Sequence, residues 1–320
     1  MSFLISIENL NIHFETEKGT VKAVNGVSFS IDEGEIFGIV GESGSGKTLT
    51  GLSIMGLLPR NKDTLVNGEI QYKSQNILRA PKQVIRKIRG SEISMIFQDP
   101  MSALNPVFTI GEQIAESFRI NTNTGKSESK KKAVEILRLV GIPDSDERYN
   151  DYPHQLSGGM AQRAVIAIAI SGNPSLLIAD EPTANLDVTI QAQVLGLIMS
   201  LQKKLKMAVI IISHDFGVIA ETTDRVAVMY AGKIQEMTGT DILLNNPLHP
   251  YTKGLLESIP RIDVDMPHLP AVPGSVPDPL NLPSGCTFHP RCSIGDEKCR
   301  IEEPVFEKKD TGHVVRCWRV

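Results

Sequence analysis

Short apolar runs alternate along the chain with longer segments in which apolar residues recur at helical spacing. Each short run is bounded by polar residues or glycine, which predicts buried β-strands over residues 5–7, 27–31, 35–40, 93–97, 176–180, 209–213 and 226–230. Helical spacing predicts helices over residues 48–58, 126–140 and 162–170. Strands separated by helices are typical of a mostly parallel sheet. We therefore expect an α/β fold, into which the mainly helical segment 98–172 is inserted.

Proline marks a boundary late in the chain. Ten of the 19 prolines lie between Pro247 and Pro290. Proline fixes φ and lacks an N–H donor, so this stretch cannot form long helices or central strands. We expect a large domain over residues 1–244, with a helical subdomain over 99–172, followed by a small irregular C-terminal extension over 245–320.

Composition narrows the possible classes of protein. The 320 residues are 41% hydrophobic and 22% charged, which suffices for a sizeable core and argues against disorder as the main state. The net charge of -4 gives no global positive excess, so no nucleic-acid partner is expected. No apolar run approaches the ~20 residues of a bilayer-spanning helix. The N-terminus also lacks the pattern of a secretory signal, so we expect the protein to stay in the cytosol.

A phosphate-binding motif follows the predicted strand 35–40. Residues 41–48 read GESGSGKT and match G-x-x-x-x-G-K-[ST]; we call them the phosphate loop. The glycines let backbone N–H groups converge on phosphate oxygens, Lys47 reaches the β- and γ-phosphates, and the Thr48 hydroxyl ligates Mg²⁺. The residues expected to bind nucleotide in this region are Gly41, Ser43, Gly44, Ser45, Gly46, Lys47, Thr48 and Thr50.

Two further predicted strands end in residues suited to nucleotide hydrolysis. Residues 176–181 read LLIADE, and Asp180 is expected to hold Mg²⁺ while Glu181 orients or deprotonates the attacking water. His214 follows the apolar run 209–212, where it could contact the γ-phosphate. Taken singly, such residues are more often solvated strand ends or packing residues. Together with the phosphate loop they predict a catalytic site of Lys47, Glu181 and His214.

Residues 156–163 read LSGGMAQR, and their two glycines open a second anion-binding helix that one nucleotide does not need. This motif resembles the signature of ABC-transporter ATPases. The resemblance extends to Gln98 in FQDP, to the ANLD segment and to His214. It implies a P-loop NTPase fold with a RecA-like parallel core, an antiparallel β subdomain and an inserted helical subdomain.

The same resemblance assigns further roles. Two ATPase subunits pair head to tail in that family, so Ser157, Gly158 and Gly159 would serve the ATP held by the partner. Gln98 would ligate Mg²⁺ and sense the membrane subunits. Phe14, in NIHFE, would stack on adenine; a plain role in core packing is the alternative.

A narrower likeness covers essentially the whole chain. The segments QDPMSALNP, YPHQLSGGMAQR, ADEPTANLDVTIQAQ and HPYTKGLLESIP resemble the D-type ATPase subunit of dipeptide and oligopeptide importers. It implies an F-type sister ATPase, two transmembrane permeases and an external binding protein as partners, at the cytoplasmic face of the membrane. A homodimer could form in isolation with ATP. Nickel, glutathione or oligosaccharide remain alternative cargoes, and a soluble ABC regulator that binds nucleic acid is a rival of another class.

All four cysteines lie in the last 35 residues, at Cys286, Cys292, Cys299 and Cys317. A reducing cytosol makes disulfides improbable, so metal binding leads the explanations. The spacing lacks the close pairs of zinc ribbons and suits either a Cys₄ zinc site or a [4Fe–4S] cluster, with His289 and His313 as possible substitutes. The family resemblance favours the iron–sulfur cluster, and free or regulatory thiols are the remaining alternative.

Overall fold

The computed structural model describes residues 3–59, 61–259, 272–310 and 312–320. The chain divides into two compact units. The first contains the chain up to Asp32, Ile36–Arg79 and Ser213–Val320, and the second contains Glu33–Glu35 and Ala80–Ile212. The C-terminal extension therefore belongs to the same unit as the phosphate loop. The division into domains 1–244 and 245–320, with a helical subdomain over 99–172, stays a prediction.

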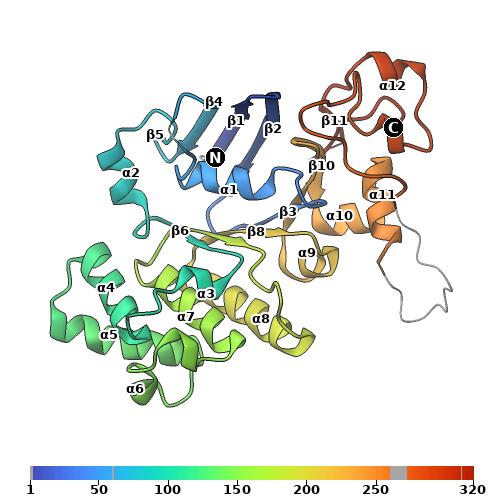
Figure 1. Cartoon of the computed structure of the whole chain (residues 1–320). Helices are drawn as coiled ribbons and strands as arrows, with labels where there is room; N and C mark the ends of the chain where they lie inside the picture. Colours follow the sequence, from blue (N-terminus) through green and yellow to red (C-terminus); the bar gives the residue numbers. More distant parts are fainter. Residues whose placement is uncertain (1–2, 60, 260–271, 311) are drawn as a thin grey trace. The chain divides into compact units, whose positions relative to one another are not determined.

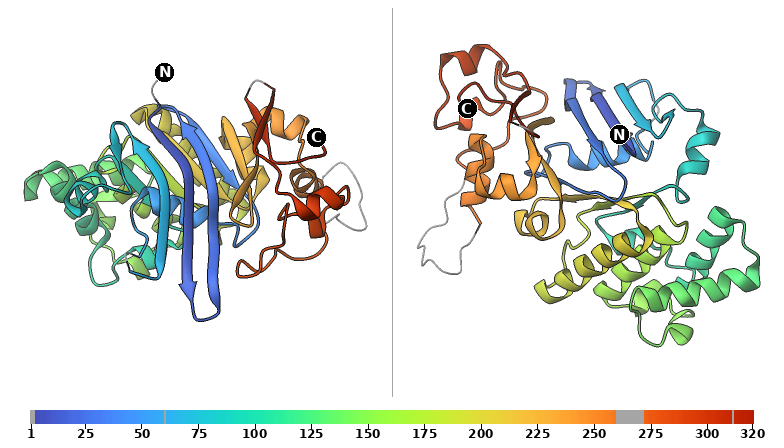
Figure 2. Two further views of the ribbon diagram at one scale, coloured as in Figure 1. Left: turned by 90° about the horizontal axis from the view of Figure 1, so that it is seen from above. Right: turned by 180° about the vertical axis from the view of Figure 1, so that it is seen from behind.

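An antiparallel sheet forms one part of the first unit. Its strands run in the order β2 (Gly19–Ile31), β1 (Ile5–Thr16), β4 (Thr64–Tyr72) and β5 (Gln75–Asn76). Figure 2 shows β1 and β2 as the long blue pair. Their inward side chains are fully buried, including Leu10, Ile12 and Val24. Burial of this apolar surface favours folding by about 25 cal/mol per Å² and supplies the core of the sheet.

The first unit also holds β3 (Ile36–Val40), followed by α1 (Lys47–Ile54). β3 pairs in parallel with β9 (Arg225–Tyr230), and β9 pairs antiparallel with β10 (Lys233–Gly239). The C-terminal strands continue this sheet, since β12 (His313–Val315) pairs with β10, and β11 (Glu307–Asp310) pairs with β12. The helices of this part are α9 (Phe216–Thr222), α10 (Thr240–Asn245), α11 (Pro250–Glu257) and α12 (Glu297–Ile301), with a 3₁₀ turn, η2 (His289–Arg291) (Figure 1).

The second unit has three parallel strands, β6 (Ile93–Ile96), β7 (Leu176–Asp180) and β8 (Ala208–Ser213). Every residue of these strands is buried. The helical elements are α2 (Lys82–Ile88), α3 (Pro100–Ala103), α4 (Ile110–Thr122), α5 (Lys126–Leu139), α6 (Ser145–Arg148), η1 (Pro153–Gln155), α7 (Gly158–Ile170) and α8 (Val188–Leu205). Among the described residues, no helix is both long and apolar enough to cross a bilayer.

A strand or helix is present at each position that the apolar pattern predicted, and the segment 98–172 is mainly helical. The first two strands are much longer than predicted, because β1 continues to Thr16 and β2 begins at Gly19. The pattern did not predict the strands β4, β5, β10, β11 and β12, nor the helices α2, α8, α9, α10, α11 and α12. The proline-rich stretch is predicted to hold no long helix, and its described part holds the eight-residue α11 and the start of the 3₁₀ turn η2. Residues 260–271 of that stretch lie outside the described part of the chain.

A buried carboxylate fixes the C-terminal extension to β10. Glu236 is fully buried. One carboxylate oxygen accepts the Leu248 N–H at 2.7 Å and lies 2.7 Å from His313 Nε2, and the other accepts the His249 N–H at 3.0 Å. A buried charge costs several kcal/mol unless it is paired and hydrogen-bonded. Glu236 thus binds both the start of the extension, at Leu248 and His249, and its end, at His313.

His249 begins α11 and is itself 1% exposed. Its Nδ1 accepts the backbone N–H of Tyr251 at 3.0 Å, which caps the helix. Burial lowers the pKa of His249 from 6.5 to about 3. The folded protein therefore holds the neutral imidazole across the mildly acidic range.

This burial predicts a loss of stability in acid. Between about pH 6.5 and pH 3 the unfolded His249 binds a proton that the folded one does not, so the free energy of unfolding should fall as pH falls through that window. His249→Asn keeps a capping oxygen that cannot be protonated. Chemical denaturation at pH 7.5 and pH 5.5 should show a smaller pH-dependent loss for this variant than for wild type. The control is His154→Asn, because His154 is exposed. An equal loss in wild type and His249→Asn would contradict the assignment.

Candidate nucleotide-binding site

The phosphate loop connects β3 to α1, and close packing leaves room only for glycine at two of its positions. A Cβ added at Gly41 would lie 2.1 Å from the carbonyl oxygen of Met229. A Cβ added at Gly46 would lie 2.6 Å from the carbonyl oxygen of Ala23, and Gly46 has φ of +100°. No other residue fits these positions without backbone movement. The loop is thus pressed against β2 and β9.

Lys47 points back across the loop. The side chain is nearly buried, and Nζ donates to the carbonyl oxygens of Gly41 at 2.7 Å and Glu42 at 3.0 Å, with Ser45 Oγ at 3.5 Å. No side chain caps α1 at Gly46, so the helix start presents backbone N–H groups and a partial positive charge. An ammonium group beside a helix start is the arrangement that binds phosphate.

The other residues predicted for this loop fall into two sets. Ser43, Gly44 and Thr48 are exposed on its open side. Thr50 is fully buried, and its hydroxyl donates to the carbonyl of Gly46 at 3.0 Å, so it faces the helix instead of the opening. Phe14 on β1 is partly exposed and pairs with Val21 of β2. Phe14 therefore lies on the strand next to β2, which carries the Ala23 carbonyl that packs on Gly46.

The second unit brings Gln98 and Glu181 together. Gln98 Nε2 donates to Glu181 Oε2 at 2.6 Å. Glu181 has φ of +45°, a conformation that a non-glycine residue adopts at a cost and that is concentrated at functional sites. Asp180, at the end of β7, is 3% exposed. These carboxylates follow a strand that is buried along its whole length.

The signature residues open α7 in the same unit. Ser157 is its N-cap and accepts the N–H of Met160 at 3.4 Å. Ser157 and Gly158 are exposed. A Cβ added at Gly159 would lie 2.9 Å from the Ile190 side chain of α8, so a larger residue there would force that side chain to move. In the first unit, His214 directly follows β8 and is exposed.

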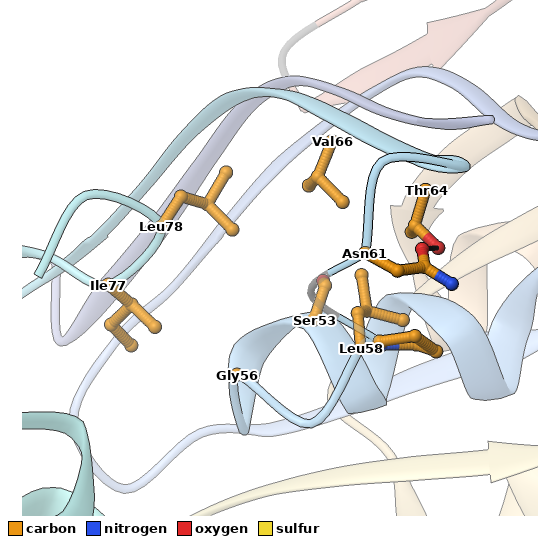
Figure 3. A pocket seen from close by; sticks show the side chains of 9 residues that line it. Ser53, Gly56, Leu58, Asn61, Thr64, Val66, Ile77 and Leu78 are labelled. Carbon is orange, nitrogen blue, oxygen red and sulfur yellow. Dashed lines mark hydrogen bonds between the residues drawn. The ribbon is translucent and has the colours of Figure 1, made fainter. Parts of the chain in front are cut away.

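A pocket of about 420 Å³ lies at the far end of α1 (Figure 3). Its walls come from the end of α1 and from the β4–β5 region, and include Ser53, Thr64 and Ile77. It contains none of the residues predicted to bind nucleotide. The candidate site is consequently defined by the phosphate loop and not by this pocket.

The four cysteines are free thiols in the C-terminal extension. Cys286 and Cys299 are buried, whereas Cys292 and Cys317 are partly exposed. Burial raises the pKa of Cys286 to about 11, and charge on the other three cysteines raises it too. In the described ranges, no three His, Cys, Asp or Glu side chains are arranged to hold a metal ion. The thiols thus lie near one another without forming a ligand set.

Sequence reasoning assigned no role to Glu42, within the phosphate loop, or to Tyr251 and Arg291, which contact it. The carboxylate of Glu42 pairs with Arg291, and its backbone N–H donates to the Tyr251 hydroxyl. Tyr251 lies in HPYTKGLLESIP and Arg291 in GCTFHPRC, and neither segment has a motif chemistry that indicates a contact with the phosphate loop.

Comparisons with known proteins agree with this geometry. Residues 24–184 match the ABC transporter family, and residues 235–299 match the C-terminal region of oligopeptide/dipeptide transporters. The chain is 49% identical to the oligopeptide transport ATP-binding protein AppD of Bacillus subtilis (strain 168), over 99% of this chain and 97% of that one. It is 42% identical to the dipeptide transport ATP-binding protein DppD of Escherichia coli (strain K12), over 98% and 96%.

The fold is similar to that of the ATP-binding cassette MJ0796, solved as a dimer in a post-hydrolysis state with ADP and Pi. The TM-score is 0.66 at 27% identity, over 74% of this chain and 98% of that one. A second dimeric structure of the same cassette gives 0.65 at 26% identity. With the phosphate loop, the strand-end carboxylates and the signature helix in place, the chain belongs to the ABC transporter family, among the ATP-binding proteins of oligopeptide and dipeptide transport.

Proposed function

We propose that the chain binds and hydrolyses Mg²⁺-ATP to drive uptake of dipeptides or oligopeptides through a membrane importer. The observation that carries the proposal is the phosphate loop, with the Lys47 ammonium turned into it and an uncapped helix start behind it. Full-length similarity to oligopeptide and dipeptide transport ATP-binding proteins supports the choice of cargo. Nickel, glutathione and oligosaccharide are the alternative cargoes.

In this proposal Glu181 acts as the general base toward water, and His214 contacts the γ-phosphate. The hydrogen bond from Gln98 supports the assignment of Glu181, because it orients the carboxylate. Oxygen atoms of Thr48, Gln98 and Asp180 are of the type that Mg²⁺ prefers. Bound Mg²⁺ neutralises charge on the phosphates. Phe14 stacks on the adenine.

We further propose that Ser157, Gly158 and Gly159 close over ATP held by another ATPase subunit, either an F-type sister or a second copy. The exposure of Ser157 and Gly158 at a helix start supports this role. The similar cassette MJ0796 was solved as a dimer.

Two substitutions test the shared site. Glu181→Gln should lower hydrolysis by about 10²–10⁴-fold, because the general base is lost, while ATP binding and an ATP-dependent dimer persist. Ser157→Asp keeps a good N-cap residue but places a negative charge against the phosphate. Light scattering with ATP should give a dimer for Glu181→Gln and a monomer for Glu181→Gln with Ser157→Asp. A dimer in both cases would refute the shared site.

Permease docking is proposed for an apolar patch of the second unit, at the peripheral, cytoplasmic face of the membrane. We define the patch as four exposed apolar side chains that are close in sequence, between β6 and α4: Phe97, Met101, Val107 and Phe108. Val107 is 71% and Phe108 51% exposed. Apolar side chains that cluster on a surface mark an interaction site more often than single ones do.

Val107→Ser with Phe108→Ser should abolish co-purification with the permeases and leave ATP binding unchanged. In vesicles containing the whole importer, uptake of a labelled dipeptide should fall at least tenfold, since each lost anchor costs about 1 kcal/mol or more. Ile120→Ser is the matched control, because Ile120 is 74% exposed on α4 outside the patch. Retained uptake in the double variant would exclude the patch as the permease-docking site.

The same vesicles test the cargo. If nickel, glutathione or an oligosaccharide competes with the labelled dipeptide and unlabelled peptide does not, the proposed peptide cargo would be wrong.

We also propose that the four cysteines hold a [4Fe–4S] cluster, with Zn²⁺ as the alternative. Support comes from their concentration in one small extension and from their mutual electrostatic influence. Ligand geometry lends none. Protein purified without oxygen should contain about four irons and four sulfides per chain, which Cys292→Ser should lose. About one zinc without sulfide would favour the alternative, and the absence of both would refute metal binding.

A further inference from the structure

Glu42, the second residue of the phosphate loop, has every polar group engaged. Its carboxylate accepts Arg291 Nη1 at 2.7 Å and Nη2 at 3.1 Å, and its N–H donates to the Tyr251 hydroxyl at 3.0 Å. Its carbonyl accepts Lys47 Nζ at 3.0 Å and the Ser45 N–H at 3.2 Å. One residue thereby joins the C-terminal extension to the lysine expected to bind phosphate.

Arg291 is held rigidly by the extension. Its side chain is only 4% exposed. Nε donates to the Pro273 carbonyl at 2.7 Å, and Nη2 donates to the Val272 carbonyl at 3.2 Å. The guanidinium also lies 5.5 Å from the centre of the Tyr230 ring. A bidentate pair between a guanidinium and a carboxylate fixes direction as well as charge, so the extension determines where the Glu42 carboxylate points.

Tyr251 reaches the loop because of how α11 begins. His249 caps the helix, Pro250 occupies its first turn, and Tyr251 is fully buried. Its ring packs against Tyr230 at 4.7 Å and Phe288 at 5.3 Å between centroids. The run HPY therefore directs a phenol hydroxyl at the backbone of Glu42.

An unpaired carboxylate at Glu42 would oppose nucleotide binding in two ways. Its negative charge would repel the triphosphate, and the freed side chain could pair with Lys47 in place of phosphate. The ion pair with Arg291 neutralises the charge and holds the carboxylate in place.

We propose that Arg291 and Tyr251 are positioning residues for ATP binding, through which the C-terminal extension sets the nucleotide affinity of the phosphate loop. The inference rests on the proposed ATP-binding function. Coupling between two sites is reciprocal, so ATP should also tighten the hold of the extension on Glu42.

Equilibrium binding of Mg²⁺-ATP to the full chain tests the proposal. Arg291→Met keeps an unbranched side chain but removes the charge, and the dissociation constant should rise about tenfold, within the ~5–150-fold range of couplings between sites. Adding Glu42→Gln removes the carboxylate charge that Arg291 had balanced, and should restore affinity to within about twofold of wild type. Tyr251→Phe removes only the hydroxyl and should weaken binding a few fold. Arg300→Met is the control, because Arg300 is an exposed arginine of the same extension.

The outcomes are distinct. Unchanged affinity in Arg291→Met would overturn the proposal. A loss of affinity that Glu42→Gln does not restore would also overturn it, because a folding defect in the extension is not repaired by changing the loop. Hydrogen exchange on the extension of wild type should slow when ATP is added, and equal exchange with and without ATP would contradict the reciprocal coupling. Failure of the wild-type chain to bind ATP would refute the proposed function. Normal ATP binding by wild type together with the same dissociation constant in Arg291→Met would refute only this inference.

Discussion

The close approach of Gly41 to the carbonyl of Met229 joins the phosphate loop to the end of β9, and the conformation of the loop depends on it. The loop turns sharply there because nothing larger than hydrogen fits at Gly41. The next turn is tied down as well, since the Gly232 N–H donates to the Ser45 carbonyl at 3.1 Å. With the backbone fixed in this way, the Lys47 side chain lies across the loop and donates to the carbonyl oxygens of Gly41 and Glu42.

The wall behind the loop continues directly into the C-terminal extension. Tyr230 follows Met229, and its ring contacts both Tyr251 and Phe288. The buried Glu236, a few residues further along, supplies the polar anchor. An aromatic cluster and a satisfied buried carboxylate together give the extension a defined position, although it has little regular secondary structure. The loop and the extension therefore share one packed region.

Local patterns predicted the local structure well. The phosphate loop, the strand ending in Asp180 and the capped start of α7 could be predicted because each is specified by neighbours in sequence. β4 is harder to predict because the dipeptide Asn67-Gly68 is typical of a turn. In the structure Gly68 continues the strand with φ of +106°. A Cβ at this position would lie 2.5 Å from the Asn9 carbonyl oxygen.

Pairs distant in sequence could not be predicted. The segment KIQEMTG of β10 is polar in composition, and Glu236 is buried only because His313 and the start of α11 satisfy it. The contact of Glu42 with Arg291 spans 249 residues in sequence. In each case tertiary contacts override what the local sequence indicates.

The pairing of β12 with β10 also changes which strand is the outer edge of the sheet. Without the extension, β10 would present a row of unpaired backbone groups beside largely buried side chains, which is a template for association with other chains. With it, the outermost strand is β11, where Glu307, Lys308 and Lys309 are exposed. Charged side chains on an edge strand discourage edge-to-edge aggregation. The extension thus replaces an apolar edge of the sheet with a charged one, and a chain that ended at residue 244 would leave the edge of β10 open to pairing with other chains.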